Sequence, residues 1–68
     1  MNALKYIRTV YGVEAHQFQR IRFEIDGREG VILGGKAGRL RVRFDGEKRT
    51  SFLHPTWKVT YLLTRTAA

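Results

Sequence analysis

The sequence predicts a mainly β domain in which a short N-terminal helix precedes five strands that close into a small barrel. In several short segments apolar and polar residues alternate with a period of two, which is typical of half-buried strands. Asp26-Gly27 and Asp45-Gly46 separate such segments, and Asp-Gly favours a tight hairpin turn. Closing the sheet would remove the edges that an open five-stranded sheet exposes, so a barrel is favoured.

Length and composition limit the chain to one small domain, residues 1–68, with a single core. The chain has 68 residues and no cysteine, so disulfides cannot stabilise it. Its two histidines cannot complete a tetrahedral zinc site without carboxylates, and we expect no metal or other cofactor. The 43% hydrophobic residues, which include eight aromatic side chains, must therefore supply the stability.

The charge balance favours polyanionic partners. Thirteen Lys and Arg face six Asp and Glu, which gives a net charge of +7 and an isoelectric point near 10.6. Such an excess on a small surface attracts nucleic acid at long range. No apolar run approaches the length of a membrane span, and the N-terminus lacks the apolar segment of a signal peptide. These features predict a cytoplasmic protein.

The first element is predicted to be a short helix over residues 3–11. Its apolar side chains recur at helical spacing: Ala3, Leu4, Ile7, Val10 and Tyr11. Asn2 can cap its start, and Gly12 can end it in a left-handed conformation. A helix this short must dock on something, so it either covers one end of the barrel or binds a partner. The sequence favours the first interpretation without deciding between them.

The strands are predicted from the alternation and the turns between them, over residues 20–26, 29–34, 38–45, 48–53 and 57–63. Residues 13–19 are expected to form a loop with one or two apolar anchors, Val13 and Phe18. On the first strand Ile21, Phe23 and Ile25 should face the core. Pro55 cannot donate to a sheet ladder, so a 3-10 turn is expected before the last strand. Phe23, Phe44, Trp57 and Tyr61 are assigned to the core.

The segment between Gly38 and Gly46 has the clearest pattern in the chain. Leu40, Val42 and Phe44 alternate with Arg39, Arg41 and Arg43. Because successive side chains of a strand point to opposite faces, one face should be buried and the other should carry three guanidinium groups about 6.6 Å apart.

These three arginines are the centre of a predicted nucleic-acid-binding surface, with Arg20, Arg22, Lys36 and Arg49 contributing. Arginine binds phosphate in a bidentate manner, and such a surface would contact the DNA or RNA backbone with little sequence information. The alternative is cross-strand pairing with Glu24, Asp26, Glu29 and Glu47, which are too few to neutralise the arginines.

No catalytic site is predicted. No motif places a hydroxyl in a relay with His54, and the glycine-rich residues 34–38 lack the ending of a phosphate-binding loop. The alternative for the aromatic side chains is an exposed platform for stacking single-stranded bases, but a core this small needs the four on apolar faces. The sequence leaves Tyr6, Tyr11, Phe18 and Phe52 unassigned, with room for one of them to be exposed.

The order of four consecutive strands, a 3-10 turn and a fifth strand resembles SH3-like barrels. Residues 29–42, Glu-Gly-Val-Ile-Leu-Gly-Gly-Lys-Ala-Gly-Arg-Leu-Arg-Val, are similar to the KOW-type segments of ribosomal proteins and transcription elongation factors. That resemblance implies contacts with RNA or protein. The phrases Arg-Val-Arg-Phe-Asp-Gly and His-Pro-Thr-Trp resemble small uncharacterised phage and prophage proteins, which would place the protein in the cytoplasm of a bacterial cell or phage-infected host.

Two functions follow as hypotheses. The first is a small basic protein that contacts the phosphate backbone of DNA or RNA. The second is a protein-interaction or assembly module of phage origin, such as a virion component or a modulator of a host protein, which would present the same arginines to an acidic partner. The sequence distinguishes neither DNA from RNA nor one oligomeric state from another.

Overall fold

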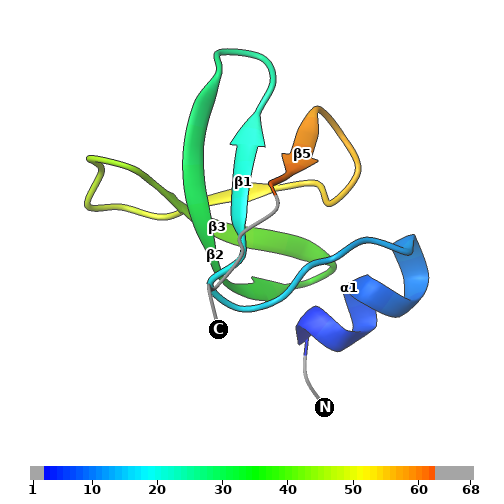
Figure 1. Ribbon diagram of the computed structural model, residues 1–68. Helices are drawn as coiled ribbons and strands as arrows, with labels where there is room; N and C mark the ends of the chain where they lie inside the picture. Colours follow the sequence, from blue (N-terminus) through cyan, green and yellow to red (C-terminus); the bar gives the residue numbers. More distant parts are fainter. Residues whose placement is uncertain (1–2, 63–68) are drawn as a thin grey trace, which may run out of the picture.

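The computed structural model describes residues 3–62, which form one helix and a five-stranded antiparallel sheet (Figure 1). The elements are α1 (Ala3–Tyr11), β1 (Arg20–Phe23), β2 (Arg28–Lys36), β3 (Arg39–Phe44), β4 (Ser51–Leu53) and β5 (Val59–Tyr61). The mainly β fold with a short N-terminal helix is thus confirmed. The strand order is β4-β3-β2-β1-β5, so β4 and β5 are the edges. Within residues 3–62 no ladder joins these two edges, and the sheet is unclosed.

The core lies on the concave side of the curled sheet, and β3 contributes most to it. Leu40, Val42 and Phe44 are 0–1% exposed, whereas the three arginines between them are exposed, as their alternation predicted. The other buried core residues are Leu4, Ile7, Ala15, Ile21 and Ile32. We call the side of the sheet that carries this core the inner face and the opposite side the outer face.

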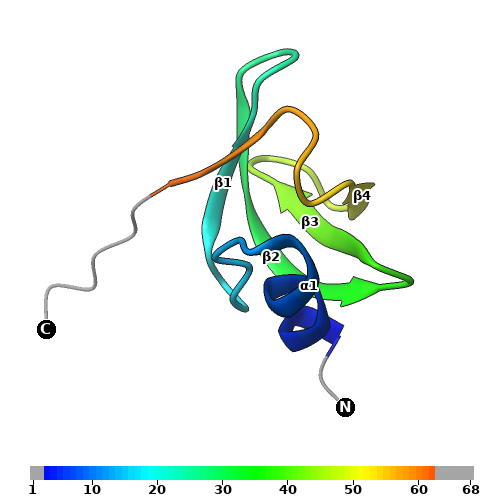
Figure 2. The ribbon, with the colours of Figure 1, turned by 90° about the vertical axis from the view of Figure 1, so that its right-hand side faces the viewer.

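The helix α1 covers the end of the sheet near the β2–β3 turn (Figure 2). Its bounds are those predicted, and Gly12 ends it at φ +66° with its N–H donating to the Arg8 carbonyl. A Cβ on Gly35 of β2 would lie 3.1 Å from Ile7 Cδ1, so this glycine permits the close approach of the helix. Val10 is 52% exposed, and the buried stripe is therefore narrower than predicted. The suggested cap Asn2 lies outside the described residues.

No helix within residues 3–62 could cross a membrane, because α1 has only nine residues.

The first hairpin differs from its prediction. β1 ends at Phe23, and residues 24–27 form a four-residue turn closed by a hydrogen bond from Gly27 N–H to the Phe23 carbonyl. Of these four residues only Gly27 has a positive φ, and the Asp26 carboxylate accepts the Arg28 N–H, which stabilises the wider turn. Ile25 consequently lies in the turn and is 57% exposed, so its assignment to the core was wrong.

The second hairpin shows why Lys36 lies beside the arginines of β3. β2 extends to Lys36 and β3 begins at Arg39, whereas strands over 29–34 and 38–45 were predicted, and the turn is Ala37–Gly38, both with positive φ. The register shifts between Ile32 and Gly34, which makes Leu33 the extra residue of a β-bulge. Because of this extra residue, Lys36 pairs with Arg39 and stands on the outer face.

Two aromatic side chains, Phe18 and Trp57, are exposed. Phe18, the expected loop anchor, is 65% exposed with φ +69°, because the backbone around it hydrogen-bonds to Ile32 of β2 instead. Trp57, an expected core residue, is 55% exposed. Trp57 precedes β5, in the segment where a 3-10 turn was predicted. This segment has one hydrogen-bonded turn, in which the Trp57 N–H donates to the His54 carbonyl at 3.3 Å. β4 and β5 are each shorter than predicted, with three residues.

Tyr61 fastens the β4–β5 connection to the sheet. Its hydroxyl donates to the carbonyl of the buried Pro55 at 2.7 Å, and burial raises the pKa of Tyr61 to about 12. We expect Tyr61→Phe to lower the free energy of unfolding by about 1 kcal/mol in urea titrations at pH 7. Tyr6→Phe, at a half-exposed tyrosine, is the control and should be neutral.

The raised pKa of Tyr61 also predicts a loss of stability in alkali. A folded-state pKa above the unfolded value of 10.0 means that the stabilisation is complete below pH 10 and is lost as the pH rises toward 12. Urea titrations across this range should show a decline that is smaller in Tyr61→Phe. An equal decline in both proteins would contradict the assignment.

Candidate nucleic-acid interface

The arginine row, defined as Arg39, Arg41 and Arg43, lies along the outer face of β3. All three side chains are exposed. Each has a cross-strand neighbour on the same face: Lys36 beside Arg39, Phe52 beside Arg41 and Val31 beside Arg43. The pleat of one strand and the β-bulge in the next therefore place four cations on one surface.

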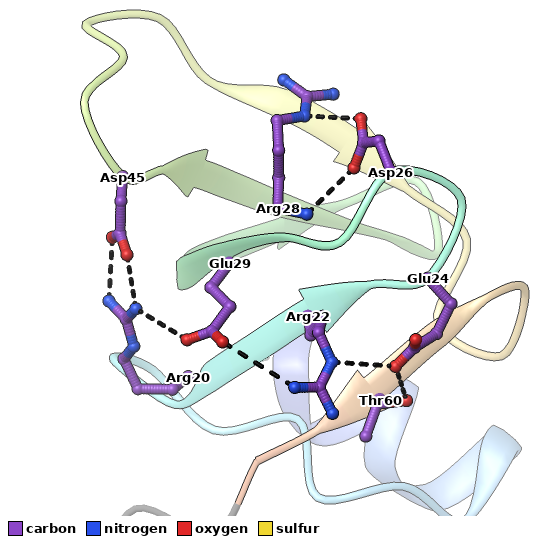
Figure 3. Close-up of polar contacts among 8 residues, drawn as sticks. All are labelled: Arg20, Arg22, Glu24, Asp26, Arg28, Glu29, Asp45 and Thr60. Atoms are coloured by element: carbon purple, nitrogen blue, oxygen red, sulfur yellow. Dashed lines mark hydrogen bonds and ion pairs between the residues drawn. The ribbon is translucent and has the colours of Figure 1, made fainter.

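Arg20 and Arg22 of β1 share this face but are held by carboxylates (Figure 3). Arg20 binds both oxygens of Asp45, at 2.9 and 2.5 Å, and lies 3.4 Å from Glu29. Arg22 lies 3.2 Å from Glu24 and 3.8 Å from Glu29. The predicted contribution of these two arginines is thus partly neutralised inside the protein.

Arg28 forms ion pairs with two further carboxylates at the end of the core. Its guanidinium stands over the Phe44 ring, 4.2 Å from the centroid, and contacts Asp26 at 2.6 Å and Glu47 at 2.5 Å. A cation over an aromatic face with flanking carboxylates forms a compact polar cap. Asp26 and Glu47, two of the acids predicted as alternative partners of the arginines, therefore pair with Arg28 and not with the arginine row.

All six acidic residues of the chain lie within the described residues, and each has a partner elsewhere. Five of them bind Arg20, Arg22 and Arg28, and Glu14 contacts His16 at 3.1 Å. Between residues 3 and 62 no hydrogen bond or ion pair links a side chain to the arginine row, to Lys36 or to the exposed Arg49 of the β3–β4 connection. The β1 side of the outer face is therefore close to neutral, whereas the β3 side is strongly positive.

The ion pairs also affect the response to acid. The hydrogen bond from Arg20 lowers the pKa of Asp45, and the charge of Arg43 adds to this effect. A lowered folded-state pKa contributes stability above the unfolded value of 3.8, and that stability is lost as the pH falls through the folded-state pKa. We expect thermal melts between pH 5 and about 2 to show this loss. Asp45→Asn should flatten the dependence, and an unchanged profile would contradict the role of this pair.

An open groove adjoins the arginine row. It has a volume of about 510 Å³, and its lining includes Arg39, Phe52, His54, Thr56 and Trp57. We call it the aromatic groove. The sequence analysis placed Trp57 in the core and left Phe52 unassigned, whereas both are surface residues. Phe52 faces outward because its neighbour Leu53 pairs with the buried Leu40, a register that only the structure gives.

Nothing in residues 3–62 forms a cluster of three His, Cys, Asp or Glu side chains that could hold a metal ion. The His54 ring is held by its own turn, where Nδ1 accepts the Thr56 N–H at 3.1 Å. Comparison of the chain with protein-family models, curated protein sequences and solved structures finds no match.

Proposed function

We propose that the protein binds nucleic acid through the phosphate backbone, with the arginine row as the principal contact. The observation that carries this proposal is the distribution of carboxylates. Each of the six acidic side chains forms its hydrogen bonds and ion pairs with a residue outside the row, so the guanidinium groups of β3 are exposed and have no hydrogen-bonded carboxylate within residues 3–62, although the charge of Asp45 acts on Arg43. A linear set of free guanidinium groups matches a polyanion better than a compact anion.

The other basic residues have graded roles in this proposal. Lys36 extends the row across the second hairpin, and Arg49 adds charge from the β3–β4 connection. Arg20 and Arg22 contribute less, because their charges are shared with carboxylates. Contacts of this kind carry little sequence information and suit DNA and RNA alike.

We further propose that the sheet is an SH3-like barrel. Four consecutive antiparallel neighbours and a fifth strand returning to β1 support this assignment. The turn at residues 54–58, pinned through Tyr61 and Pro55, spans the side between the two edge strands.

The proposal is tested by anisotropy titrations of labelled mixed-sequence duplex DNA and single-stranded RNA at several salt concentrations. Four contacts, from the arginine row and Lys36, predict a slope of log K against log salt of about −3.6 for duplex DNA, at roughly −0.9 per phosphate. Absence of binding to both probes at low salt would refute the proposal.

A second candidate function is a protein-interaction or assembly module. Tyr6 and Val10 are 50% and 52% exposed and stand four residues apart on α1, so they share one side of the helix. Pull-downs with and without nuclease separate the two functions, because only protein contacts survive the nuclease.

A further inference from the structure

We propose that the aromatic groove takes an unpaired base, so that the protein prefers single-stranded nucleic acid over duplex. This inference rests on the proposed function and names the form of nucleic acid that the surface binds. Phe52 and Trp57 are 50% and 55% exposed, although a domain of this size has few large side chains to spare from its core. Both line the same groove.

The groove and the arginine row are continuous. Arg39 belongs to both, and Phe52 is the cross-strand neighbour of Arg41. A chain whose phosphates follow the row therefore passes beside two exposed aromatic rings. Single-strand-binding proteins combine these two components, a positively charged track for the backbone and aromatic faces on which bases stack.

The groove walls are fixed in place. The Trp57 ring centroid lies 6.0 Å from that of Phe23, which in turn lies 6.3 Å from the buried Phe44. His54 stands against Tyr11 with ring centroids 5.3 Å apart. Because a backbone N–H can only donate, the Thr56 bond to Nδ1 leaves the proton of the neutral His54 ring on Nε2. That N–H can donate to an acceptor on a base or a phosphate.

A duplex cannot use this site, because its bases are already stacked and paired. An unpaired base gains the stacking contact, which corresponds to about 5- to 150-fold in affinity per base. The sequence preference should be weak, since every base offers an aromatic face.

The test uses the fluorescence of Trp57, the only tryptophan of the chain. Three probes of equal length are titrated: oligothymidylate, an abasic strand with the same phosphates, and a duplex. We expect saturable quenching with oligothymidylate alone and weaker binding of the abasic strand by at least about 5-fold. Phe52→Leu should weaken oligothymidylate binding by a similar factor and leave abasic binding unchanged. Phe18→Leu, at an aromatic residue that is 65% exposed outside the groove, is the matched control and should bind as the wild type.

The outcomes separate this inference from the proposed function. Equal, salt-dependent binding of all three probes without quenching overturns the base site and leaves backbone binding intact. Absence of binding to every probe overturns both. If Phe52→Leu does not weaken oligothymidylate binding while quenching persists, the assignment of the base site to the aromatic groove is also overturned.

Discussion

Replacing Arg39, Arg41 and Arg43 together with glutamine should nearly abolish binding to duplex DNA. Each phosphate that a cation neutralises contributes about −0.9 to the slope of log K against log salt, so three lost contacts reduce the slope by about 2.7. Taking the two affinities as equal at 1 M salt, where the electrostatic contribution is screened, this corresponds to an affinity roughly 500-fold weaker at 0.1 M. Anisotropy titrations at several salt concentrations measure both quantities.

The triple variant is expected to keep its fold. The three side chains are exposed and no hydrogen bond or ion pair within residues 3–62 depends on them, so surface substitutions here should change stability by less than about 1 kcal/mol. A far-ultraviolet spectrum and a urea titration check this. Lost binding in an unfolded variant would carry no information on the interface.

A pair of single variants separates local contacts from net charge. Arg41→Gln and Arg22→Gln each remove one positive charge from the outer face, but Arg22 already lies against Glu24 and Glu29. We expect Arg41→Gln to reduce the salt slope by about one, and Arg22→Gln to reduce it by less. Equal effects would show that only total charge matters and would contradict the special role of the arginine row.

Gly30→Ala should cause the largest loss of stability among single small substitutions in the sheet. Gly30 is buried in β2, opposite Phe44 of β3 and Ile21 of β1. An added Cβ would lie 2.6 Å from the Arg43 carbonyl oxygen and 2.9 Å from Phe44 Cα. Both are backbone atoms of the strand that holds the core, so they cannot move aside without breaking the ladder.

We expect this substitution to cost about 3 kcal/mol, the upper end of the usual range for overpacking. For a domain of this length that corresponds to a fall in melting temperature of roughly 12–24 °C. Gly34→Ala is the matched control, because a Cβ at that position has nothing within 4 Å and β2 continues on either side. It should be neutral or slightly stabilising, since alanine reduces the entropy of the unfolded chain. Comparable melting temperatures for the two variants would contradict this account of Gly30.

The elements with strong local patterns could be predicted from the sequence. Helix α1 has its predicted bounds because its apolar spacing and the helix-ending Gly12 both indicate an end at Tyr11. The predictions for Ile25 and Trp57 were wrong for a common reason, which also explains the exposure of Phe18. Each lies in or next to a turn, where backbone hydrogen bonds and positive φ angles set the direction of the side chain instead of strand alternation.

The candidate site, too, could be predicted only in part from the sequence. Alternation along β3 was enough to place Leu40, Val42 and Phe44 inside and the arginine row outside, because a strand has a period of two whatever its neighbours are. Which carboxylates pair with which arginines depended on the register of β1, β2 and β3. That register brings Asp45 to Arg20 across 25 positions of the chain, and within residues 3–62 no carboxylate forms a hydrogen bond or ion pair with the row. The bulge at Leu33, which turns Lys36 outward, and the groove between Phe52 and Trp57 likewise arise only when strands distant in sequence are paired.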